Sequence, residues 1–146
     1  GIQGGLTAPM DNFGRNLDVG YNFGLLLDLR APASPVSFRI DGMYHSMDVS
    51  GSSTANVDVL AGTANVVIRM DRSLLTTPYL IGGAGLYGTR VSVPSGNSDF
   101  NTDIGFNIGG GLQFGMAGLT AFVEARYHAV HDQNVRFLPV TFGLLF

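Results

Sequence analysis

Apolar and polar residues alternate one by one along most of this chain, and that period constrains its fold more than any other feature. The stretch from Leu17 to Arg30 shows it most clearly, because large apolar residues occupy every second position from Val19 to Leu29. Successive side chains of a β-strand point to opposite faces, so the period predicts a strand with one apolar face. The same pattern recurs twice in residues 121–146, on either side of a short polar turn.

The alternation divides the chain into about eight strands, the smallest number typical of outer-membrane barrels, within a single β-barrel domain spanning residues 1–146. We expect strands at Gly1–Ala8, Leu17–Arg30, Val36–Val49, Val57–Met70, Tyr79–Val93, Asp103–Phe114, Ala121–His131 and Val135–Phe146. Glycines leave the two faces of residues 79–93 unassigned, and residues 94–102 read as the longest polar loop. Turns after the odd-numbered strands are polar and the others compact, an asymmetry typical of transmembrane barrels.

The composition favours an apolar face that points outward. Charged residues make up only 13% of the chain, and every basic residue is Arg, whereas ordinary soluble domains are about 25% charged and commonly protect strand edges with Lys. The opposite face mixes both signs of charge with many glycines, as expected of a narrow interior filled by side chains. We therefore predict an antiparallel up-and-down barrel, apolar outside and polar inside, with a soluble barrel or sandwich as the alternative.

Charges enclosed in such a barrel must be paired or hydrogen-bonded. The strand spacing puts Asp28 roughly opposite Arg39 across one hairpin and Asp41 near Asn65 across the next. Glu124 and Arg126 lie two apart on one strand and so share a face. The predicted interior polar network comprises Asp28, Arg39, Asp41, His45, Asn65, Arg69, Asn107, Gln113, Glu124, Arg126 and His128.

The order of the segments resembles the small outer-membrane β-barrels of Gram-negative bacteria, the OmpA/OmpX-type transmembrane domain. The resemblance covers essentially the whole chain and is carried by residues 78–85, 106–114 and 122–127 and by the terminal Phe146. In that family, an aromatic C-terminus preceded by alternating apolar residues resembles the signal read by the barrel-assembly machinery.

Three residues of this chain match that C-terminal signal: Phe142, Leu144 and Phe146. Thr141 stands where the family usually has glycine, which is a departure from the pattern. The first strand is short, as it would be if residues before Gly1 had been removed, and a processed chain would lack a signal peptide.

The resemblance implies a structural protein of the bacterial outer membrane, an envelope anchor or stabiliser that is neither an open pore nor an enzyme. Its partners would be membrane lipid and, during biogenesis, the assembly machinery. An alternative is a self-assembling, homo-oligomeric subunit of an extracellular filament, tube or sheet, with neighbouring barrels at the apolar wall. A third is a carrier of a small apolar ligand, against which a polar interior argues.

No cofactor or nucleic acid is expected. The net charge of −3 argues against nucleic acid, whose binders usually carry a basic stripe. The chain has no Cys, and hence no thiolate metal site. Residues 83–88 match the dinucleotide fingerprint G-x-G-x-x-G, but a strand-like segment follows where that motif needs a helix.

Two further patterns have a simpler structural explanation. Residues 104–123 carry no charge and are long enough for a membrane helix, yet their alternation has period 2, which favours strand. His128 and His131 point to opposite faces of a strand and cannot share a metal. A hydrolase triad of Glu124, His128 and Ser46 would need outward-facing groups, whereas Glu124 and His128 are predicted to point inward.

Overall fold

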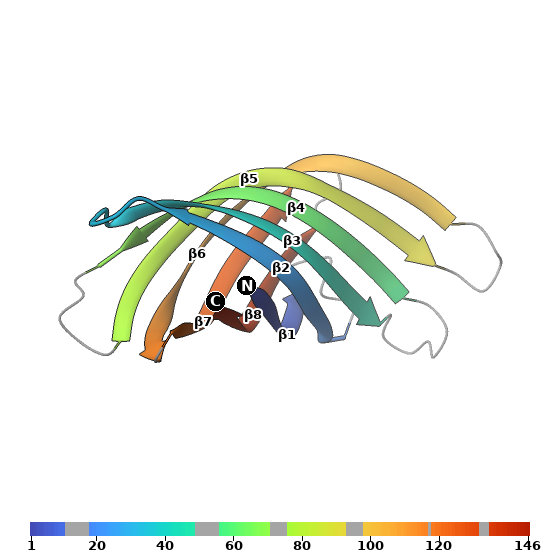
Figure 1. Cartoon of the computed structure of the whole chain (residues 1–146). Coiled ribbons are helices and arrows are strands. Elements are labelled where there is room, and N and C mark those ends of the chain that lie inside the picture. The colour runs from blue at the N-terminus through green and yellow to red at the C-terminus, as the bar shows by residue number, and fades with distance from the viewer. Residues whose placement is uncertain (11–17, 49–55, 71–75, 93–97, 117, 132–134) are drawn as a thin grey trace.

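The computed structural model describes residues 1–10, 18–48, 56–70, 76–92, 98–116, 118–131 and 135–146, without the side chains of 91, 92, 98–100 and 116. Within these ranges the chain forms a closed antiparallel β-barrel (Figure 1). The predicted fold class is therefore confirmed. No helix in the described part of the chain is long and apolar enough to cross a membrane.

The strands follow one another around the barrel in chain order. They are β1 (Ile2–Pro9), β2 (Gly20–Arg30), β3 (Val36–Asp48), β4 (Asn56–Arg69), β5 (Thr76–Ser92), β6 (Ser98–Met116), β7 (Leu119–Val130) and β8 (Arg136–Leu145). β1 also pairs with β8, where Ile2 lies opposite Leu144, and this pairing closes the barrel. Both chain ends therefore lie at the same seam (Figure 1).

The largest difference from the predicted boundaries lies at β6. Residues 98–102, expected in a loop, belong to this strand, whose first residue Ser98 pairs with Ser92 of β5. Apart from Phe100 the segment is polar and lacks alternation, so the local sequence does not predict a strand. Pairing with β5 extends it, as tertiary context often does. At β2 the difference is in the other direction, because the strand begins at Gly20.

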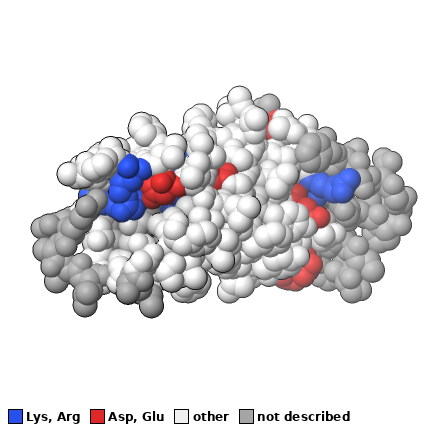
Figure 2. Space-filling view, in the orientation of Figure 1, with Lys and Arg blue, Asp and Glu red and all other residues white. Residues whose placement is uncertain are grey.

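Large apolar side chains point outward over most of the wall. Leu25 is 67% exposed, Ile108 68% and Phe142 62%, and these residues come from three different strands. Figure 2 shows that, on the face drawn, charged atoms gather mainly toward the two ends of the barrel and leave the wall between them nearly uncharged. The outward apolar face that the alternation predicts is therefore present.

The interior is less uniformly polar than the sequence suggested. Along β4 the inward residues are first apolar (Val57, Val59, Ala61), then polar (Thr63, Asn65), then apolar at Val67 and polar again at Arg69. The first apolar cluster comprises Met43, Met47, Val57, Val59, Ala61, Tyr87, Val130, Val135 and Phe137. The second comprises Leu26, Val67, Tyr79, Ile81 and Phe122. The polar side chains in the middle of β4 therefore lie between residues of the two apolar clusters, and the buried Arg69 lies beyond the second cluster.

Candidate functional site

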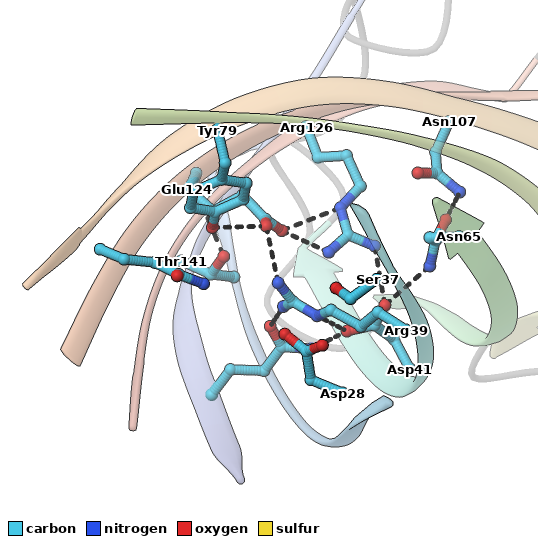
Figure 3. Close-up of polar contacts among 12 residues, drawn as sticks. Asp28, Ser37, Arg39, Asp41, Asn65, Tyr79, Asn107, Glu124, Arg126 and Thr141 are labelled. Atoms are coloured by element: carbon cyan, nitrogen blue, oxygen red, sulfur yellow. Dashed lines mark hydrogen bonds and ion pairs between the residues drawn. The ribbon is translucent and has the colours of Figure 1, made fainter. Parts of the chain in front are cut away.

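Four charged side chains from β3 and β7 meet at the centre of the barrel. Arg39 Nε lies 3.0 Å from Asp41 Oδ1 and its Nη1 lies 2.9 Å from Glu124 Oε2. Arg126 Nη1 lies 3.2 Å from Asp41 Oδ2, and Arg126 also pairs with Glu124. All four residues are 1–2% exposed, and Figure 3 shows both guanidinium groups pointing toward the two carboxylates. Each arginine thus contacts both acids, and the two positive charges balance the two negative ones.

Neutral groups from four other strands complete the hydrogen bonding of this group. On the Asp41 carboxylate, Gln3 donates to Oδ1 at 3.0 Å and Asn65 to Oδ2 at 2.7 Å. Tyr79 Oη donates to Glu124 Oε2 at 2.7 Å. Asn107 Nδ2 donates to the side-chain oxygen of Asn65 at 2.8 Å, which extends the network to β6. The network therefore connects strands on opposite sides of the barrel through its interior.

A second polar group lies nearer the turn between β2 and β3. Arg69 forms an ion pair with Asp28 and donates to Ser37 Oγ at 2.7 Å and to Gln113 Oε1 at 3.0 Å. Asp28 is indeed the register partner of Arg39, but its ion pairs are with Arg69 and Arg30. Register determines only which Cα atoms lie opposite each other. The long Arg39 side chain extends past Asp28 to the two central acids, Asp41 and Glu124.

The histidines His45 and His128 lie on the other side of the central charges. Their ring centroids are 6.0 Å apart, and Phe137 packs 4.8 Å from each. His45 Nδ1 is hydrogen-bonded to Thr7 Oγ1 at 2.9 Å and His128 Nδ1 to Tyr87 Oη at 2.8 Å. Neither Nε2 has a hydrogen-bond partner in the described part of the chain. Both rings thus act as hydrogen-bonded packing groups in an aromatic cluster.

The residues of the imagined hydrolase triad are not brought together. Glu124 is bonded to two arginines and to Tyr79, while Ser46 Oγ donates to Asp58 at 2.8 Å. His131 is exposed and His128 buried, as expected of opposite strand faces. In the described ranges no group of three or more His, Cys, Asp or Glu residues is arranged to hold a metal ion.

Sequence reasoning missed two members of the central group, Gln3 and Tyr79. Gln3 stands at an inward position of the short β1, and the network predicted from the sequence does not include it. Tyr79 lies in β5, whose faces glycines obscured. Its register with Arg69 across the turn before β5 was the signal that could have assigned it, because directly opposed residues share a face.

Solved structures share this architecture. The crystal structure of neisserial surface protein A matches with a TM-score of 0.73 and 17% identity, over 98% of this chain and 93% of that one. The N-terminal barrel of OprF from Pseudomonas aeruginosa matches with 0.55 and 13%, over 99% and 96%. Ail, the attachment invasion locus protein of Yersinia pestis, matches with 0.55 and 19%, over 98% and 93%.

The fold is that of the small eight-stranded outer-membrane β-barrels. No protein-family model and no curated protein sequence matches the chain. At these identities of 13–19% the likeness concerns the fold alone.

Proposed function

We propose that the protein is a structural barrel of the bacterial outer membrane that anchors or stabilises the envelope. The observation that carries the proposal is the wall, where large apolar side chains such as Leu25, Phe106 and Ile108 are more than half exposed. A hydrocarbon layer tolerates such a wall and requires closed backbone pairing, which the β1–β8 seam supplies. The similarity to three outer-membrane barrels supports the same location.

The interior supports a barrel that does not conduct. The central charges from β3 and β7 join across the lumen, and an apolar cluster lies on each side of them. A water-filled channel would instead need an open polar interior, as in larger porins. Interior side chains held by several bonds each support the proposal that ions find no continuous path.

The two ends of the barrel suggest an orientation. The connections after β2, β4 and β6 span residues 31–35, 70–75 and 117–118, and those after β1, β3, β5 and β7 span 10–19, 49–55, 93–97 and 131–135. Outer-membrane barrels place short turns toward the periplasm and longer loops outward. Residues 10–19 are the longest connection, which favours the second group as the outer end.

The test is reconstitution of the purified chain into lipid vesicles. A folded outer-membrane barrel should insert, should migrate differently on gels before and after heating, and should leave the vesicles impermeable to small ions. Failure to insert would contradict the membrane role, and a stable single-channel conductance would contradict the sealed interior. Lipid-free ordered polymers would instead favour the self-assembling alternative, in which the same apolar wall packs against neighbouring barrels.

A further inference from the structure

The hairpin of β5 and β6 extends beyond the strand on its other side. β6 pairs with β5 from its first residue, where Ser98 lies opposite Ser92. Its pairing with β7 begins only at Gly105, opposite Val130, the last residue of β7. Figure 1 shows the start of β6 at the right of the view, as the last strand of a row that runs β3, β4, β5, β6. Residues 98–104 therefore form a sheet edge in the described part of the chain.

The open backbone groups of this edge belong to alternate residues. The Ile104 carbonyl accepts a hydrogen bond from His131 N at 3.0 Å, on the β7 side. In an antiparallel strand both backbone groups of one residue point to the same side, and the side changes at each residue. Phe100 and Thr102 therefore point their N–H and C=O groups the same way as Ile104, and no strand of the described ranges pairs with them there. Such an edge is a template for another extended chain.

The two faces of the edge differ in chemistry. Residues 98–103 read Ser-Asp-Phe-Asn-Thr-Asp, with two aspartates and no basic residue. Asp103 shares the inner face of β6 with the buried Asn107, whereas Ile104 is 59% exposed on the outer face. Arg90 of β5 is exposed on that outer face as well, so a second positive charge is favoured only on the inner one. A strand added here would place its residues alternately beside an acidic face and beside an apolar one.

A second copy of the same edge fits poorly. If two β6 edges paired antiparallel through their open residues, Phe100 of one copy would lie opposite Thr102 of the other. Asp99 would then lie opposite Asp103 at both ends of the pairing, and like charges directly opposite each other are destabilising. The edge therefore disfavours pairing with itself and favours a basic segment.

We propose that this edge of β6 binds an extended segment of a partner protein in which basic residues alternate with apolar ones. The segment adds as a strand beside Phe100 and Thr102, with its basic side chains on the inner face toward Asp103 and its apolar side chains on the outer face. Strand addition takes its affinity from main-chain hydrogen bonds and its specificity from alternate side chains. The inference rests on the proposed function for the location of the partner, because the proposed orientation places residues 93–97 at the outer end.

The probe is a short synthetic peptide that alternates valine and lysine, added to the folded barrel in zwitterionic detergent micelles. The measurement is backbone amide hydrogen exchange by NMR. At saturating peptide we expect exchange at Phe100 and Thr102 to slow by about tenfold, since one net hydrogen bond contributes about that factor. The amide of Asn101, which points toward β5, should not change. A peptide that alternates valine and glutamate should leave all three amides unchanged.

Thr102→Pro removes one open N–H without removing a bond to β5, because proline is tolerated where the N–H of an edge strand faces away from the sheet. It should weaken binding of the lysine peptide by about tenfold, whereas Thr102→Ser, which keeps the N–H, should not. A heat-modifiable band shows that both variants have folded.

Unchanged exchange with the lysine peptide, or equal slowing with the glutamate peptide, overturns the inference and leaves the membrane role intact. Slowing that depends on protein concentration without peptide, together with a doubled mass, assigns the edge to a second copy and also overturns the inference. Failure of the unmodified chain to insert into lipid vesicles would overturn the proposed function and, with it, the outward location of the partner.

Discussion

At the scale of single residues, the central charges make each member dependent on the others. Arg39 and Arg126 each contact both Asp41 and Glu124, and all four lie out of water. Taking a charge from water is costly and is offset only by well-placed partners. Deleting one member should therefore affect stability more than an exposed ion pair does.

Arg126→Met tests this dependence. We expect the free energy of unfolding to fall by about 3–5 kcal/mol, the usual cost of leaving a buried charge without its partner. The matched control is Arg30→Met, because Arg30 is partly exposed and 3.5 Å from Asp28 and such pairs contribute about 0–1 kcal/mol. The chain has no Trp, so denaturation is followed by circular dichroism in detergent. Equal losses in the two variants would show that the central charges are not a coupled group.

At the scale of the strands, inward glycines make room for large side chains on the neighbouring strand. Gly111 of β6 is the register partner of Tyr79. A Cβ at Gly111 would lie 2.4 Å from Val123 O and 2.6 Å from the Tyr79 hydroxyl, the group that donates to Glu124. Gly111 thus leaves the space that the Tyr79 hydroxyl occupies when it donates to Glu124.

The glycine pair Gly111 and Gly62 offers a direct comparison. Gly111→Ala should destabilise the barrel by about 1–3 kcal/mol, since overpacking forces backbone and side chains to shift. Gly62→Ala should be neutral or slightly stabilising, because its Cβ would meet no atom within 4 Å and glycine is unfavourable in a strand. The measurement is the denaturant midpoint of each variant. A loss as large in Gly62→Ala would contradict the steric explanation.

The sequence predicted the fold and most interior positions, because alternation with period 2 assigns every residue of a strand to the inner or outer face once the direction of one side chain is known. It predicted the contact of Asp41 with Asn65 and the pairing of Glu124 with Arg126, both of which the structure contains. It could not predict that Arg39 reaches Glu124, because that contact crosses the lumen between strands that are not neighbours. The inward orientation of Tyr79 could not be predicted for a different reason: β5 is rich in glycine, which carries no side chain to mark a face.

At the scale of the whole molecule, the side-chain-filled interior and the apolar outer wall have separate consequences. The interior should keep the barrel closed to ions, and the wall should decide where it resides. Ile108 lies near the middle of β6 and is 68% exposed, whereas Val19 lies just before β2 and is 61% exposed. Because the two residues are similarly exposed, one in mid-strand and one just before a strand, they allow the membrane environment to be tested.

Ile108→Arg should weaken folding into bilayers by about 2–4 kcal/mol, whereas Val19→Arg should cost only about 0–1 kcal/mol, because the penalty for a charge falls toward the interface. Both are measured as the denaturant dependence of folding into vesicles. If the wall faced water, the two substitutions would have similar, small effects, and that result would contradict a lipid-facing wall.

The most direct test of the central claim is fractionation of native material followed by imaging. We predict that the protein is recovered from detergent-extractable outer membranes as a heat-modifiable monomer. Recovery as ordered, detergent-resistant extracellular polymers without lipid would contradict the account, because the apolar wall would then be an interface between barrels.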